Sequence, residues 1–180
     1  MNQKKILLGI TGGIAAYKAA ELVRQFIKAG HQVQVVMTQS ATEFVGPVTY
    51  QALSGREVFV DMWDKQRGDS MAHISLTRWA DVFVIAPATA NFLAKLANGI
   101  ADDLLSTLAA ARECPLLVAP AMNREMWANP ANQRNIRQLQ QDGVMILGPA
   151  SGAQACGEIG EGHMLEAAEI ALRVEASFQA

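Results

Sequence analysis

Short, uninterrupted apolar runs recur along the chain, separated by longer segments with a different pattern. None of these runs alternates polar and apolar positions, as a strand with one solvated face would. Continuous Val, Ile and Leu runs are typical of parallel strands that helices cover on both sides. The predicted buried strands are Lys5–Ile10, Gln32–Met37, Asp81–Ala86 and Pro115–Ala119, with Gly143–Leu147 as a fifth.

The segments between these runs carry the spacing of apolar residues that is typical of helices. The clearest case is Ile14–Ala29, which Gly30 terminates. Its residues Ala19, Leu22 and Phe26 fall on one helical face. Further helices are predicted over Asn91–Asn98, Asp102–Arg112, Asn129–Gly143 and Leu165–Phe178.

Strand and helix alternate along the chain, which indicates βαβ units. Their crossovers are right-handed and place helices on both faces of one sheet. We therefore predict an α/β fold, a three-layer α/β/α Rossmann-like (flavodoxin-like) parallel sheet, as a single domain over residues 1–180. In such folds ligands bind beyond the carboxyl ends of the strands, where the connecting loops gather.

The composition excludes several functional classes. The 180 residues are 51% apolar and 18% charged, with a formal charge of −2, whereas disordered chains show the opposite balance. The absence of a Lys/Arg run argues against a nucleic-acid surface, and no apolar run reaches the roughly 18 residues of a membrane span. The two cysteines, Cys114 and Cys156, offer no zinc-binding spacing. We expect a soluble, cytoplasmic protein with no metal and no membrane or nucleic-acid partner.

The first predicted strand runs into a loop of small residues, from Gly9 to Ile14, that opens a helix. Backbone N–H groups in such a loop can approach an anion, which the helix N-terminus also favours. The spacing is neither GxGxxG nor GxxxxGK[ST], and the second strand ends in Thr38-Gln39-Ser40 without an acidic residue for a ribose. The loop therefore fits the phosphate of a mononucleotide such as FMN. Equally, Gly12 and Gly13 can simply form a tight turn.

Two further strands end in segments that could serve a ligand or only begin a helix. Pro87–Asn91 combines small residues, which leave room for a flat ring, with the polar Thr89 and Asn91. Either polar residue could instead be the N-cap of the next helix. After the fourth strand, Asn123 could donate its amide hydrogens to a carboxylate or act only as a cap.

Two weakly patterned segments carry the other candidate groups. The glycine-rich stretch Pro149–Met164 has few side chains that could anchor it, so we expect a mobile lid that brings Cys156 over a site. The irregular segment Ser54–Ile74 contains His73, just before a short helix toward Trp79. The other two histidines, His31 and His163, are expected to be solvated.

Taken together, these segments resemble one family, the flavin-dependent cysteine decarboxylases, and within it the enzymes of coenzyme A biosynthesis that act on phosphopantothenoylcysteine. The matching stretches are GITGGIAAYK (9–18), the His73 segment, PATAN (87–91), ADDLLST (101–107), PAMNREMW (120–127) and ACGEIGEGHM (155–164). The family pattern at the third of these motifs is PASANT. This chain keeps a hydroxyl there with Thr89 but has Phe92 in place of the last Thr, so no cofactor contact is expected from position 92.

The resemblance implies FMN as the cofactor and a role for each matching residue. His73 would be the base of an oxidative half-reaction, Asn123 would hold the substrate carboxylate, and Cys156 would donate a proton as the product forms. The residues that would hold FMN are Thr11, Gly12, Gly13, Ile14, Thr38, Gln39, Ser40, Ala88, Thr89, Ala90, Asn91 and Ala121. The residues that would contact substrate are Asn123, Gln154, Ala155 and Met164.

The same resemblance implies partners and a reaction. The substrate would be 4'-phosphopantothenoylcysteine and the product 4'-phosphopantetheine. The chain would form homo-oligomers, trimers with FMN at subunit interfaces that assemble into dodecamers, and would be the N-terminal part of a longer bifunctional decarboxylase/synthetase. Two alternatives of similar fold remain open, an FMN-binding regulatory protein and a flavin prenyltransferase. An NAD-dependent dehydrogenase ranks last because the dinucleotide fingerprint is missing.

Overall fold

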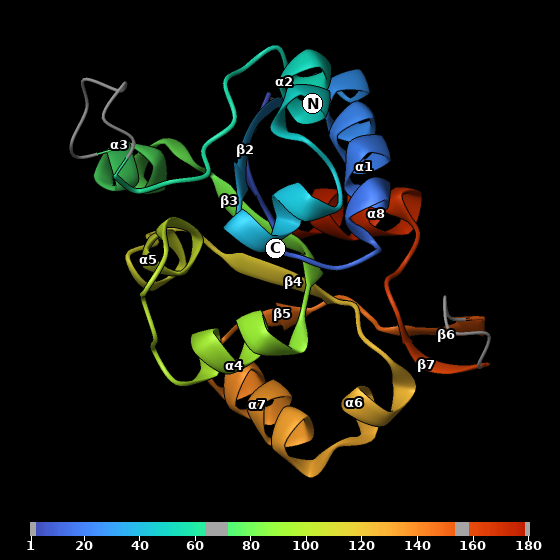
Figure 1. The fold of residues 1–180 in the computed structure, drawn as a ribbon. Coiled ribbons are helices and arrows are strands. Elements are labelled where there is room, and N and C mark those ends of the chain that lie inside the picture. The colour runs from blue at the N-terminus through green and yellow to red at the C-terminus, as the bar shows by residue number, and fades with distance from the viewer. Residues whose placement is uncertain (1–2, 64–71, 154–158, 179–180) are drawn as a thin grey trace.

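A central parallel sheet organises the computed structural model, which describes residues 3–63, 72–153 and 159–178 (Figure 1). The strand order is β2-β1-β3-β4-β5. The strands are Lys5–Ile10 (β1), Gln32–Met37 (β2), Val82–Ala88 (β3), Leu116–Pro120 (β4) and Met145–Ile146 (β5). The predicted bounds of β1 and β2 are confirmed, β3 and β4 begin one residue later than predicted, and β5 is shorter than Gly143–Leu147.

Helices cover both faces of the sheet, so the predicted three-layer architecture is confirmed (Figure 1). One layer contains α1 (Ala16–Lys28), α2 (Pro47–Ser54) and α8 (Ala167–Ser177). The opposite layer contains α3 (Ala72–Trp79), α4 (Ala90–Ala97), α5 (Leu104–Ala110) and α7 (Pro130–Gln141). Two short helices lie in loops, the 3-10 helix η1 (Gln39–Glu43) and α6 (Arg124–Ala128). None of the helices in the described ranges is long and apolar enough to cross a bilayer.

Alternation of side chains along the strands divides the core between these layers. Ile6 and Leu8 of β1 point to the α1 and α8 side, whereas Leu7 between them packs with the opposite layer, and all three are fully buried. Successive side chains of a strand face opposite ways, so a continuous apolar run is what two covered faces require.

The glycine-rich segment forms regular structure that the sequence did not predict. Its strands Ala150–Ala153 (β6) and Ile159–His163 (β7) pair as an antiparallel hairpin, with Ser151 opposite Glu161 and Gly152 opposite Gly160. Figure 1 shows this hairpin apart from the main sheet. The sequence predicted no strand pairing for this segment, so the hairpin is a difference from the expected irregular loop.

His31 is buried, contrary to the sequence-based expectation that it is solvated. The residue is 5% exposed, its Nδ1 accepts a hydrogen bond from the backbone N–H of Lys4 at 3.1 Å, and its Nε2 contacts Glu175. Because Nδ1 accepts, the ring proton is on Nε2 and is donated to the Glu175 carboxylate. This contact fastens α8 to the amino edge of the sheet.

Candidate functional site

Hydrogen bonds join the loops that follow β1, β3 and β4. The hydroxyl of Thr11 donates to the carbonyl of Pro87 at 2.7 Å and accepts from the backbone N–H of Thr89 at 3.0 Å. The N–H of Ala121 in turn donates to the carbonyl of Ala88 at 3.0 Å. Thr11 is 1% exposed, so its side chain holds two loops together. The predicted convergence at the carboxyl edge of the sheet is confirmed.

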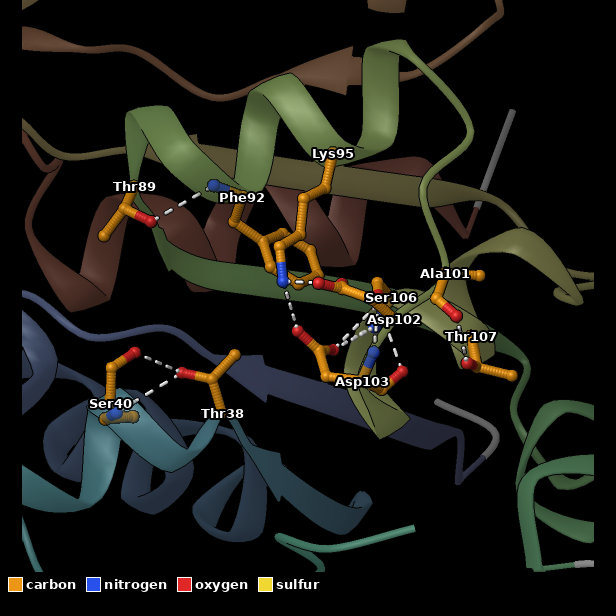
Figure 2. Close-up of polar contacts among 11 residues, drawn as sticks. Thr38, Ser40, Thr89, Phe92, Lys95, Ala101, Asp102, Asp103, Ser106 and Thr107 are labelled. Atoms are coloured by element: carbon orange, nitrogen blue, oxygen red, sulfur yellow. Dashed lines mark hydrogen bonds and ion pairs between the residues drawn. The ribbon is translucent and has the colours of Figure 1, made fainter.

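The first loop packs closely against η1. Thr38 donates its N–H to the carbonyl of Ile10, and its hydroxyl lies 3.0 Å from that of Ser40 (Figure 2). A Cβ at Gly12 would lie 2.6 Å from Cβ and 2.8 Å from the carbonyl carbon of Ser40. Internal packing therefore accounts for Gly12. At Gly13 a Cβ would make only an ordinary 3.5 Å contact with Thr89, so packing does not require glycine there.

The N-terminal end of α1 offers donors to an anion. Among the described residues, no hydrogen-bond acceptor is found for the backbone N–H groups of Gly12, Gly13 and Ile14. The helix also has no side-chain cap at Ala15 and no acidic residue in its first turn. An uncapped helix N-terminus without local negative charge is favourable for phosphate.

The loop after β3 places small residues beside these donors. The Thr89 hydroxyl accepts from the N–H of Phe92 at 3.3 Å and so caps α4 (Figure 2). Ala88 and Ala90 are buried, and Asn91 is exposed. Phe92 is 1% exposed in the core, which fits the expectation of no ligand contact from that position. Of the two cap candidates, the structure selects Thr89.

Asn123 is the N-cap of α6 and lies between two residues that contact the hairpin. Its Oδ1 accepts from the N–H of Glu125 at 2.7 Å, so the side-chain oxygen caps the helix and a bond to a carboxylate would come from Nδ2. In the same loop, the backbone N–H of Met122 donates to the carbonyl of Gly162 in β7 at 2.9 Å. Capping and ligand binding by Asn123 are therefore compatible.

An ion cluster, consisting of Lys95, Asp102 and Asp103, fixes α4 against the start of α5. Lys95 Nζ lies 2.6 Å from Asp102 and 2.8 Å from Asp103 (Figure 2). Asp103 also forms a capping box with Ser106, so the N-cap of α5 is Asp103, one residue after the expected cap at Asp102. The hydrogen bond from Lys95 lowers the pKa of Asp102. Burial opposes the charge of Lys95, but its two aspartate partners raise its pKa overall. Sequence spacing did not single out Lys95.

The other residues that the sequence assigned to the site are distributed between a helix, the core, the surface and the part of the chain outside the described residues. His73 lies in α3, directly after its first residue. Gln154, Ala155 and Cys156 lie outside the described residues. Met164 is 1% exposed and belongs to the core on the α1 side, which indicates a packing role for its side chain. Gln39 and Ser40 are exposed, as is Ile14.

A concave surface elsewhere on the molecule is separate from these loops. It is bordered by Lys95, Arg112 and Leu116, the residue at which β4 begins. The concavity therefore lies at the amino edge of the sheet. Parallel α/β folds bind their ligands at the carboxyl edge, where the three joined loops are.

Comparison with known proteins connects this geometry to a family. The chain matches the family described as Flavoprotein over residues 1–179. It is 52% identical over 176 residues to the coenzyme A biosynthesis bifunctional protein CoaBC of Vibrio parahaemolyticus, a match that covers 98% of this chain and 44% of that protein. The chain thus spans less than half the length of that relative.

Two solved structures are similar over almost the whole chain. One is a cysteine-to-serine variant of PPC decarboxylase complexed with pantothenoylaminoethenethiol, with a TM-score of 0.89, 35% identity, and coverage of 99% of this chain and 100% of the other. The second is the FMN-dependent cysteine decarboxylase SpaF, with a TM-score of 0.80, 38% identity, and coverage of 97% and 98%.

Proposed function

The chain belongs to the Flavoprotein family, and on that premise we propose that it is an FMN-dependent decarboxylase of 4'-phosphopantothenoylcysteine, with 4'-phosphopantetheine as product. The observation that carries the proposal is the convergence of three loops, with an uncapped helix N-terminus in one and Asn123 in another. The similarity to PPC decarboxylase and to CoaBC supports the choice of substrate. A cytoplasmic location fits coenzyme A biosynthesis.

The residues of the first two loops fit FMN. The N–H groups of Gly12, Gly13 and Ile14 would bind the phosphate, with the hydroxyl of Ser40 close to Gly12. The small residues from Ala88 to Asn91, together with Ala121, would border the ring. When bound, FMN supplies reversible two-electron chemistry, so that the thiol-bearing carbon is oxidised before CO₂ leaves and is reduced again afterwards.

The need for that oxidation follows from the substrate. Direct loss of CO₂ from a cysteine carboxylate would leave a carbanion that nothing stabilises. Once the adjacent CH₂–SH is a thioaldehyde, the electrons of the breaking C–C bond pass onto sulfur and an enethiolate forms. Reduction and protonation of the enethiolate then give the aminoethanethiol, with no net oxidation.

Three side chains have assigned tasks in this proposal. His73 takes the proton from the substrate thiol as the carbon is oxidised, a task that suits an imidazole at neutral pH. Asn123 donates from Nδ2 to the carboxylate and orients it, while its Oδ1 remains on the N–H of Glu125. Cys156 gives the proton that completes the saturated product. Gln154 and Ala155 would contact the substrate beside it.

A homo-oligomer is part of the proposal. Ile14, at the end of the phosphate loop, and Tyr17, in the first turn of α1, are 62% and 61% exposed. An apolar pair beside a ligand site is typical of a surface that another subunit covers. We propose that copies of the chain, as trimers that can assemble further, meet there and complete the FMN site.

Product analysis tests this function. The purified chain, loaded with FMN and incubated with phosphopantothenoylcysteine, should yield a product lighter than the substrate by one CO₂. His73→Asn should abolish turnover, and Cys156→Ser should retain FMN but accumulate the unsaturated enethiol. FMN binding without turnover would favour a regulatory protein. Turnover of a prenyl phosphate in place of the cysteine adduct would identify a prenyltransferase.

A further inference from the structure

A buried lysine joins α1, the helix that follows the phosphate loop, to the β6–β7 hairpin. Lys18, in α1, is 9% exposed, and its Nζ donates to Nε2 of His163 at 2.8 Å and to Oε1 of Glu166 at 2.6 Å. His163 is the last residue of β7, and Glu166 precedes α8. An ammonium can only donate, so Nε2 of His163 accepts and its ring proton is on Nδ1.

Stability alone does not explain a charge at this position. Burial of an ammonium is unfavourable unless partners compensate for the lost hydration, and a well-packed apolar residue often stabilises such a position equally well. The neighbouring core position, Ala19, is apolar. The hydrogen bond from Lys18 lowers the pKa of Glu166, yet the Glu166 side chain is 72% exposed, so the ion pair contributes little to stability.

The same strand is fixed on its other side by α6 and the loop before it. Trp127 Nε1 donates to Glu161 at 3.1 Å. A Cβ at Gly160 would lie 2.9 Å from Cδ of Arg124, so the arginine side chain crosses the strand at this glycine. Together with the bond from Met122 to Gly162, these contacts hold β7 beside the loop that carries Asn123. Strand β7 therefore bridges α1 and α6.

From this bridge we infer that Lys18 is a positioning residue for the proposed reaction: its contact with His163 sets the position of β7, and through β7 that of the Asn123 loop, relative to the N-terminal end of α1. The inference rests on the proposed function, because those two places are the proposed carboxylate and phosphate sites. A small misplacement of reacting groups can lower a rate by about a hundredfold, so such a link affects turnover more than folding.

Two substitutions at position 18 and a control on the same helix test this role. Lys18→Met removes the donor with little change in shape, Lys18→Arg retains a charged donor, and the control Lys28→Met changes an exposed lysine in the last turn of α1. FMN-loaded protein is used to measure kcat, KM, flavin per chain, the thermal midpoint and amide hydrogen exchange of residues 159–163.

The expected result separates positioning from stability. Lys18→Met should keep its flavin and nearly its thermal midpoint, exchange faster at residues 159–163, and lose about tenfold or more in kcat. Lys18→Arg should recover most of kcat, and Lys28→Met should equal the native chain. The partner gives an independent test, since His163→Gln retains an acceptor and should keep kcat, whereas His163→Phe should lose it.

Other outcomes overturn the inference. If Lys18→Met keeps the native kcat and the native amide exchange, the contact between Lys18 and His163 does not position β7. If Lys18→Met loses its flavin, Lys18 acts on cofactor binding and not on the position of β7. If Lys18→Met fails to fold, equal kcat values for His163→Gln and His163→Phe would equally show that the contact has no positioning role. If the native chain itself does not turn over, the proposed function fails, while unchanged exchange in the variants would separately refute the link.

Discussion

At the scale of single residues, the adjacent glycines Gly12 and Gly13 differ in how closely the surrounding atoms pack against them. Gly12 is required by its contact with Ser40, whereas Gly13 has room for a Cβ. Neither glycine has a positive φ, so the difference is one of space and not of backbone conformation. The sequence left a tight turn and a phosphate loop open for both positions, and the packing explains only Gly12.

Substitution of each glycine by alanine should affect the stability of the flavin-free chain differently. Gly12→Ala should lower the free energy of unfolding by about 1–3 kcal/mol, because the new methyl group overpacks against η1. Gly13→Ala should leave it unchanged or raise it by roughly 0.4–1 kcal/mol through a less flexible unfolded chain. Urea unfolding measures both, and equal effects would contradict the assigned packing.

Asn123 has one observed role, as the cap of α6, and one proposed role, as the donor to the substrate carboxylate, and substitution can separate them. Asn123→Asp keeps an oxygen for the N–H of Glu125 and should unfold at the native urea concentration, but its charge repels the substrate carboxylate, so KM should rise by about tenfold or more. Asn123→Ala should lose both tasks and about 1 kcal/mol of stability. A native KM for Asn123→Asp in steady-state kinetics would remove this residue from the substrate site.

At the scale of elements, regular periodicity was predictable and irregular pairing was not. The buried strands and the long helices follow from apolar runs and helical spacing, and Asn129 caps α7 as its position before Pro130 suggests. The β6–β7 hairpin was missed because its glycine-rich strands lack the apolar pattern of a core strand. Helix α2 was also missed. Pro47 marks its start, but its apolar side chains are not gathered on one face, so the sequence shows no helical pattern there.

The junction of α4 and α5 should show a specific pH dependence. The pKa of Asp102 is lowered by Lys95, so its contribution to stability is complete above its unfolded pKa of about 3.9 and is lost as pH falls through the lower folded value. Lys95→Met should therefore unfold at less urea than the native chain at pH 7. The two urea midpoints should approach each other at pH 2.5, and a constant difference would contradict the role of the ion pair.

At the scale of the whole molecule, strand direction explains how much of the site was predictable. The five strands of the main sheet are parallel, so their carboxyl ends share one edge, and the loops with Gly13, Thr89 and Asn123 had to converge. Contacts between distant segments, such as Lys18 with His163, have no local signature. For the same reason the burial of His31, which depends on Lys4 and Glu175, could not be predicted.

The proposed assembly depends on the exposed side chains of Ile14 and Tyr17, where the phosphate loop leads into α1. Tyr17→Glu places a charge where another subunit should pack, and sedimentation analysis should then find a smaller species with less bound FMN. Leu172→Glu is the matched control, because Leu172 is 71% exposed on α8 and away from the phosphate loop in the sequence. A native sedimentation coefficient for Tyr17→Glu would exclude this surface from the interface.

The most direct test of the account is CO₂ release from phosphopantothenoylcysteine labelled in its cysteine carboxyl group. The flavin-free chain should release no labelled CO₂, and addition of FMN should restore release of one CO₂ for each saturated thiol formed. Release that is independent of FMN, or no release from the flavin-loaded chain, would contradict it.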